Sequence, residues 1–223
     1  MFDAVLFDLD GTLIDSEAVA IRTGLATFHR LGHPVDAAFF HAMIGRDSPT
    51  ASRMIAAAFP AMNVEALNAA WSEGFQAAMA TEIPLKPWVH ETLSAISLPL
   101  AIVTSSRRLE AADKLKRAAL DRYFSHVVVL EDVVAPKPAP DPYLLAARLL
   151  NVDPKRCLVF EDSETGAESA HRAGCVVVQV PDILPTKGRW AHHVAADLMA
   201  GANAVGLRIG PGQSATSLVG AKR

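Results

Sequence analysis

Five short apolar runs, rich in β-branched residues, alternate with segments of helical pattern along the chain. They cover residues 4–7, 98–103, 127–130, 157–160 and 176–180. Such runs are typical of strands buried on both faces, and their alternation with helices indicates a parallel sheet covered on both sides. We therefore expect an α/β fold with a doubly wound, Rossmann-like parallel sheet. Polar residues at the carboxyl ends of its strands are the first place to look for chemistry.

The first two runs are separated by residues 8–97, far more than one crossover helix needs. Within this segment residues 16–84 are rich in alanine and helical in pattern throughout. We expect them to form an inserted α-helical cap domain over the carboxyl edge of the sheet. The catalytic core would then comprise residues 1–15 and 85–209, and residues 210–223 would form a loose tail.

One helix of the core is predicted over residues 108–119. Leu109, Ala112, Leu115 and Ala119 recur at helical spacing and form one apolar face. We expect this face to be the buried one.

Composition and charge exclude several classes of function. The formal net charge of −3 gives no general attraction to nucleic acid or to an anionic membrane. No apolar stretch approaches the roughly 18 residues that span a bilayer, and the first residues lack the basic region of a signal peptide. Cys157 and Cys175 lack metal-type spacing and are expected to be reduced core thiols. We expect a cytoplasmic protein, a monomer or weak dimer, with no nucleic-acid or membrane partner.

Two aspartates, Asp8 and Asp10, end the first run within the string DLDGT at residues 8–12. Alternation along an extended segment points both side chains the same way. Carboxylates this close require a cation or a shared proton. One can act as a nucleophile while its neighbour works as an acid and then as a base. The structural alternative is a polar strand end at which Asp10 or Asp15 only caps a helix.

Three later motifs follow in order. Thr104 stands in IVTSS, Lys137 in KPAPD, and Glu161-Asp162 in VFEDS. With DLDGT, they make the sequence resemble the haloacid dehalogenase superfamily of aspartate-nucleophile phosphohydrolases. The likeness is greatest to the branch with a helical cap inserted after the first motif, and it covers the chain except the tail.

The resemblance implies that Asp8 attacks phosphorus and forms an aspartyl-phosphate. Asp10 would protonate the leaving alkoxide and then deprotonate the hydrolytic water. A Mg²⁺ ion would be held by Asp8, Asp162 and the backbone carbonyl of Asp10, because Mg²⁺ prefers hard oxygen ligands. Glu161 would bind metal-bound water.

Further residues are assigned by the same resemblance. Lys137 would offset the negative charge of the nucleophile and of the phosphoryl oxygens. The Thr104 hydroxyl and the backbone N–H of Ser105 would hold the transferring group. Each of these residues also has a simpler explanation, as a solvated loop lysine or as part of an N-cap cluster.

The same branch includes β-phosphoglucomutases, which return the phosphoryl group to a sugar. Those enzymes carry a cap histidine and a cap lysine, whereas Ala20 stands at the corresponding histidine position and residues 1–85 contain no lysine. Arg46 does match an arginine with which mutases hold the distal phosphate. We predict a phosphatase, with a mutase as the alternative. A non-catalytic binding protein of the same fold is a distant third, because all the motif residues are present.

The expected substrate is a small phosphorylated metabolite. Residues 16–84 carry four arginines against six acidic residues, which suits a neutral, hydroxylated leaving group. We therefore favour a sugar or polyol phosphate. Arg46, Ser106 and Arg107 are the further candidate substrate-binding residues. Arg46 would alternatively meet a substrate carboxylate or lie in a solvated loop.

Overall fold

Six parallel strands form one sheet in the computed structural model, which describes residues 1–43 and 48–207. The strands are β1 (Ala4–Phe7), β2 (Leu100–Val103), β3 (His126–Val128), β4 (Cys157–Glu161), β5 (Val176–Gln179) and β6 (His193–Val194). Their order across the sheet is β3-β2-β1-β4-β5-β6. Strand order reverses beside β1, which pairs with both β2 and β4. This is the position at which parallel α/β sheets bind ligands.

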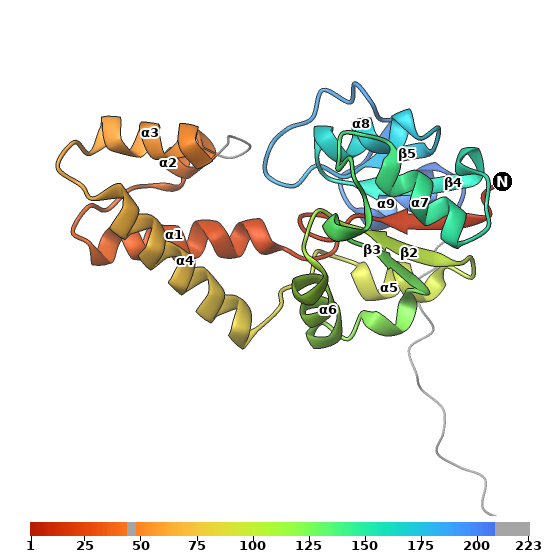
Figure 1. Ribbon diagram of the computed structural model, residues 1–223, viewed down its shortest axis with the longest axis horizontal. Coiled ribbons are helices and arrows are strands. Elements are labelled where there is room, and N and C mark those ends of the chain that lie inside the picture. Colours follow the sequence, from red (N-terminus) through yellow and green to blue (C-terminus); the bar gives the residue numbers. More distant parts are fainter. Residues whose placement is uncertain (44–47, 208–223) are drawn as a thin grey trace, which may run out of the picture.

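Helices cover both faces of the sheet (Figure 1). The core helices are α5 (Val89–Ala95), α6 (Arg108–Arg117), α7 (Asp141–Leu149), α8 (Glu164–Arg172) and α9 (Leu198–Ala204), with short 3₁₀ turns η1 (Asp121–Tyr123), η2 (Leu130–Asp132) and η3 (Pro154–Arg156). Buried residues of α5, α6 and α9 form one apolar cluster with Val5 and Phe7 of β1. Residues of α7 and α8 form another with Ala4 and Leu6. Successive side chains of β1 point to opposite faces of the sheet, so this strand contributes residues to both apolar clusters.

A helical cap is inserted between β1 and α5 and lies beyond the carboxyl end of β1 (Figure 1). Its helices are α1 (Ser16–Arg30), α2 (Ala37–His41), α3 (Ser48–Ala58) and α4 (Val64–Thr81). The cap has its own core around Phe28, whose ring lies 5.6 Å from Phe39, 5.7 Å from Phe40 and 5.7 Å from Phe59 between centroids. The α/β fold with an inserted helical cap is therefore confirmed.

The two chain segments that join cap and core run side by side. Ile14 bridges Leu85 in an antiparallel sense, and the Asp15 N–H donates to the Pro84 carbonyl at 2.9 Å. The ammonium group of Lys86 lies 3.4 Å from Asp15 Oδ1 and 2.7 Å from Asp182 Oδ1. This ion pairing ties both joining segments to the loop after β5.

Two features differ from the sequence-based expectation. The short edge strand β6 was not predicted, because a two-residue strand has no apolar run. Helix α6 is also rotated: Leu109 is 86% exposed, and Ala112 and Ala119 are exposed as well. Of the predicted face only Leu115 is buried, and it lies with Ala111, Lys114 and Ala118, which are also buried. The reason is that Lys114 pairs with Asp10 and Glu110, so that the buried face includes a charge that an apolar pattern does not reveal.

Two further expectations fall outside the described residues, namely the position of Arg46 and the tail over 210–223. Within the described residues, no helix is long and apolar enough to cross a membrane. Cys157 and Cys175 are both buried free thiols, as expected.

The orientation of α6 predicts that replacement by alanine strongly lowers the free energy of unfolding at one leucine and hardly changes it at another. Leu115→Ala should lower the free energy of unfolding by about 2–5 kcal/mol because it leaves a cavity in the core. Leu109→Ala should change it by less than about 0.5 kcal/mol because the side chain is exposed. Urea unfolding of both variants measures the difference, and equal losses would contradict the orientation of the helix.

Candidate active site

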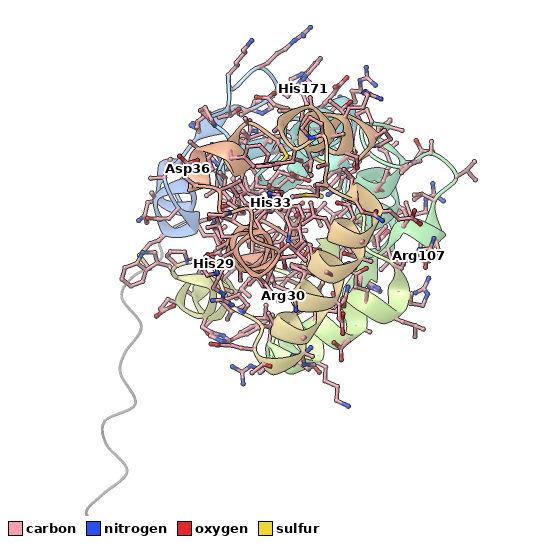
Figure 2. The ribbon with its side chains drawn as sticks, turned by 90° about the vertical axis from the view of Figure 1, so that its left-hand side faces the viewer. His29, Arg30, His33, Asp36, Arg107 and His171 are labelled. Atoms are coloured by element: carbon pink, nitrogen blue, oxygen red, sulfur yellow. The ribbon has the colours of Figure 1, made fainter. Side chains whose placement is uncertain are left out.

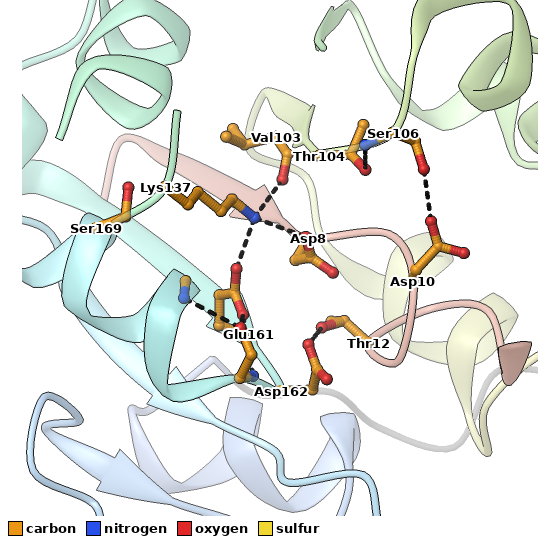
Figure 3. Close-up of polar contacts among 12 residues, drawn as sticks. Asp8, Asp10, Thr12, Val103, Thr104, Ser106, Lys137, Glu161, Asp162 and Ser169 are labelled. Atoms are coloured by element: carbon orange, nitrogen blue, oxygen red, sulfur yellow. Dashed lines mark hydrogen bonds and ion pairs between the residues drawn. The ribbon is translucent and has the colours of Figure 1, made fainter. Parts of the chain in front are cut away.

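Four of the predicted site side chains meet at the carboxyl edge of the sheet (Figure 3). Asp8 follows β1, Thr104 follows β2, and Glu161 is the last residue of β4. Because β1 pairs with both β2 and β4 in parallel, these three strand ends meet at one place. Lys137 comes from the loop before α7 and reaches the same point.

Lys137 is the electrostatic centre of the site. Its Nζ donates to Asp8 Oδ1 at 2.6 Å, to Glu161 Oε1 at 2.6 Å and to the Val103 carbonyl at 2.9 Å. Burial acts to lower the pKa of Lys137, but the charges and hydrogen bonds of Asp8 and Glu161 outweigh it and raise that pKa above its ordinary value. The lysine is therefore a fixed cation beside Asp8.

Glu161 is fully buried and both of its carboxylate oxygens have protein partners. Besides Lys137, Oε1 accepts a hydrogen bond from the Tyr143 hydroxyl at 3.0 Å. Oε2 accepts from the backbone N–H of Ser163 at 3.1 Å and from its hydroxyl at 3.0 Å. A Cβ atom at Gly166 would overlap the Glu161 carboxylate, so α8 can approach it only with glycine there. These contacts hold Glu161 in one orientation.

Three carboxylates converge opposite Lys137. One oxygen from each of Asp8, Glu161 and Asp162 lies within 4.8 Å of the others. The Thr12 hydroxyl donates to Asp162 Oδ1 at 3.4 Å. Gly11, at φ +87°, passes so near that a Cβ there would lie 2.5 Å from Asp162 Oδ2. Hard oxygen ligands in this arrangement fit a divalent cation.

The charge balance of this cluster also fits a cation. The pKa of Asp8 is raised to about 7, because burial and the negative charge of Glu161 outweigh the opposing effect of Lys137. Burial and the charges of Asp8 and Glu161 raise the pKa of Asp162 to about 9. Three carboxylates around one ammonium group leave an excess of negative charge that a bound metal ion would offset.

A cavity of about 440 Å³ opens above these groups. Its lining is polar and comes from four separate parts of the chain: Asp8, Asp10, Thr104, Ser105, Ser106, Glu110, Lys137, Asp162, Ser163, Thr165 and Gly166. Its size is that of sites for small metabolites.

Asp10 lies at the wall of the same cavity, held by a different set of partners. The Ser106 hydroxyl donates to Asp10 Oδ2 at 2.7 Å. Lys114 Nζ lies 2.9 Å from each Asp10 oxygen, 2.5 Å from Glu110 Oε1 and 3.3 Å from the Ser106 hydroxyl oxygen. The carboxyl group therefore has one serine and one lysine as its neighbours.

Sequence reasoning missed Lys114, as well as the lining residues Glu110, Ser163, Thr165 and Gly166. Lys114 belongs to no motif, and the apolar spacing of its helix placed the buried face elsewhere. A signal was present in the spacing of Glu110 and Lys114, four residues apart, but such pairs are common on exposed helix faces.

The predicted substrate-binding residues have different fates. Thr104 is buried, and its hydroxyl accepts a hydrogen bond from the Ser106 N–H at 3.0 Å. Ser105 lines the cavity, and the Ser106 hydroxyl faces Asp10. Arg107 is exposed and is not part of the cavity lining. Figure 2 shows the molecule from the cap end, with His29 and Arg30 of α1 toward the viewer. In this view Arg107 lies at the edge of the molecule. Arg46 lies outside the described residues.

Comparison with known proteins places this geometry in context. The sequence profile of the family described as haloacid dehalogenase-like hydrolase matches residues 5–180. Validoxylamine A 7'-phosphate phosphatase of Streptomyces hygroscopicus subsp. limoneus is 32% identical over 183 residues, which are 80% of this chain and 85% of that protein. Hexitol phosphatase A of Escherichia coli is 36% identical over 186 residues, 78% of this chain and 81% of that protein.

A solved structure from Thermotoga maritima, named as a candidate β-phosphoglucomutase, is similar with a TM-score of 0.77 and 26% identity. The likeness covers 91% of this chain and 98% of that one. The similarity therefore extends over core and cap together.

The raised pKa values predict how stability depends on pH and metal. The unfolded chain releases the protons of Asp8 and Asp162 near pH 4, whereas the folded, metal-free protein holds them up to about pH 7 and about pH 9. Stability that these groups contribute is thus present below pH 4 and is lost as pH rises through 7 toward 9. The melting temperature of metal-free protein should therefore fall as the pH rises from about 4 to about 9.

We expect Mg²⁺ to reverse this loss, because a divalent cation at the three carboxylates would favour their ionised forms. The rise in melting temperature on adding about 10 mM Mg²⁺ should exceed roughly 3 °C at pH 9 and be smaller at pH 5. Scanning fluorimetry measures both, with Asp162→Asn as the control that should lose most of the rise. A melting temperature that Mg²⁺ leaves unchanged at both pH values would contradict the metal site.

Proposed function

Because this chain belongs to the haloacid dehalogenase-like hydrolases, we propose that it is a Mg²⁺-dependent phosphatase of a small phosphate monoester. The observation that carries the proposal is the placement of Asp8. Its carboxylate lies in a polar cavity, with the Lys137 ammonium at 2.6 Å on one side and Asp162 on the other. A carboxylate nucleophile for phosphorus needs such an environment, since it must approach a dianion.

In the proposed reaction Asp8 attacks the phosphorus atom and the ester oxygen leaves with the bonding electron pair. Asp10 gives a proton to that oxygen, and an aspartyl-phosphate forms on Asp8. A water molecule then passes a proton to Asp10 and attacks phosphorus, which releases inorganic phosphate and restores Asp8. Asp10 is suited to both proton transfers because it lines the same cavity as Asp8.

The remaining groups offset charge and hold the phosphoryl oxygens. Lys137 stays charged beside Asp8, and Thr104 and Ser105 line the cavity wall. We propose Asp8, Asp162 and the backbone carbonyl of Asp10 as ligands of Mg²⁺, which when bound supplies the further positive charge that the phosphate dianion requires. Glu161, whose oxygens are occupied by protein donors, would act through water.

The substrate class is proposed as a sugar or polyol phosphate. One relative is named as a hexitol phosphatase and another as a phosphatase of validoxylamine A 7'-phosphate. The cap carries more acidic than basic residues, which disfavours a highly charged leaving group. We propose Arg46, Ser106 and Arg107 as contacts to the leaving group, with Arg107 reaching it only when cap and core approach each other.

A β-phosphoglucomutase activity is the second candidate, favoured by the likeness to the Thermotoga maritima structure. Ala20, at the position of the mutase histidine, has no side chain for proton transfer, and its carbonyl accepts a hydrogen bond from Trp71 at 2.9 Å. Hydrolysis is therefore the better supported of the two.

Asp8→Asn should lower phosphate release by a factor of about 10⁴ or more, because the amide cannot attack phosphorus. The far-ultraviolet circular dichroism should stay unchanged, since Lys137 can still donate to the amide oxygen. Asp113→Asn is the matched control, an exposed carboxylate paired with Arg117 on α6, and should retain full activity. Substantial turnover by Asp8→Asn would rule out this nucleophile.

A substrate panel tests the function directly. Purified protein with Mg²⁺ should release phosphate fastest from one or a few sugar or polyol phosphates, among them sorbitol 6-phosphate, fructose 1-phosphate and glycerol 3-phosphate, and excess EDTA should abolish release. Phosphoglycolate tests the carboxylate alternative for Arg46. β-Glucose 1-phosphate is assayed in parallel for glucose 6-phosphate, and isomerisation with little free phosphate would establish the mutase instead.

A further inference from the structure

Lys114 is a buried cation that the proposed reaction does not use. Only 8% of the residue is exposed, and a lysine is seldom buried to this extent unless its ammonium group has partners. Its ammonium group contacts both oxygens of Asp10 at 2.9 Å and Glu110 at 2.5 Å. We propose that Lys114 is a positioning residue, which with Glu110 and Ser106 holds the Asp10 carboxyl group at the cavity wall from which it reaches the leaving-group oxygen. This proposal rests on the phosphatase function proposed above.

The contacts of Asp10 show why it needs such a partner. Asp10 lies in the loop after β1, and its side chain is 30% exposed, so solvent competes for its oxygens. Ser106 supplies one hydrogen bond, to Oδ2 alone. Lys114 contacts both oxygens, and together with the hydrogen bond of Ser106 to Oδ2 it fixes the position and the orientation of the carboxyl group. Without it, Asp10 would sample orientations in which it cannot transfer a proton.

The lysine is itself held in place from two directions. Glu110 lies one helical turn earlier on α6 and its carboxylate accepts a hydrogen bond from the ammonium group. The helix is anchored by Ala111 and Leu115 in the core, and Arg117 at its end donates to the Met79 carbonyl of α4. Lys114 therefore sits on a fixed support rather than on a mobile loop.

A role in positioning an acid has a distinctive kinetic signature. The ratio kcat/KM covers the steps up to release of the alcohol, and only a poor leaving group needs a proton during those steps. Loss of Lys114 should therefore impair sugar phosphates and spare p-nitrophenyl phosphate, whose phenolate leaves without protonation. A general loss of folding or of metal binding would impair both substrates equally.

The experiment compares Lys114→Met with Lys116→Met, which removes an exposed lysine from the same helix. For the fastest sugar or polyol phosphate in the panel, kcat/KM of Lys114→Met should fall about 10–100-fold, part of the 10²–10⁴ that general acid catalysis contributes. For p-nitrophenyl phosphate it should change less than about threefold. Lys116→Met should leave both values unchanged, and Asp10→Ala sets the full size of the effect.

Two further variants refine the test. Lys114→Arg should recover at least part of the loss, because guanidinium also contacts both oxygens of a carboxylate. Glu110→Gln should show a smaller, equally selective loss. Equal losses on both substrates, or no loss on either, would overturn the role of Lys114 while leaving the phosphatase intact. Wild-type protein that hydrolyses neither ester would overturn the proposed function and this role with it.

Discussion

One ammonium group shared by two buried carboxylates organises the candidate active site. Lys137 lies 2.6 Å from Asp8 and 2.6 Å from Glu161, in the interior of the protein where an unbalanced charge is costly. Asp162 adds a third carboxylate without a further lysine. The pKa values of Asp8 and Asp162 are raised because these groups are buried and because the carboxylates outnumber the single ammonium group. The excess of negative charge at the strand ends fits a site that binds a cation.

The surrounding structure keeps that cluster in place rather than adding chemistry to it. Tyr143 and Ser163 occupy the oxygens of Glu161, and Gly166 gives the carboxylate room beneath α8. Gly11 does the same for Asp162 on the side of β1. The two glycines thus leave room for the carboxylates, and Asp8, Thr104 and Glu161 lie at or directly after the rigid ends of strands.

The sequence was most informative where a short motif coincided with a strand end. Apolar runs followed by polar residues marked Asp8, Thr104 and Glu161 as candidates, because parallel strands bring their carboxyl ends to one edge. The resemblance to a known family then assigned the three residues to one site. The face of α6 was predicted wrongly, since periodicity counts apolar residues and its buried face carries Lys114. The contact of Lys114 with Asp10 spans 104 positions and depends on the packed orientation of that helix. No local pattern records such a contact.

The paired joining segments have a consequence for how this architecture can change. Asp15 and Pro84 are hydrogen-bonded neighbours, so the insertion leaves and re-enters the core at adjacent points. The distance between the two points of insertion is therefore short and does not depend on the length of the inserted chain. The entropic cost of closing the inserted chain between these points rises only slowly with its length. The cap is in this sense an exchangeable module. A different cap joined at the same two points would replace contacts such as that of Arg117 with Met79 and would leave the order of the strands unchanged.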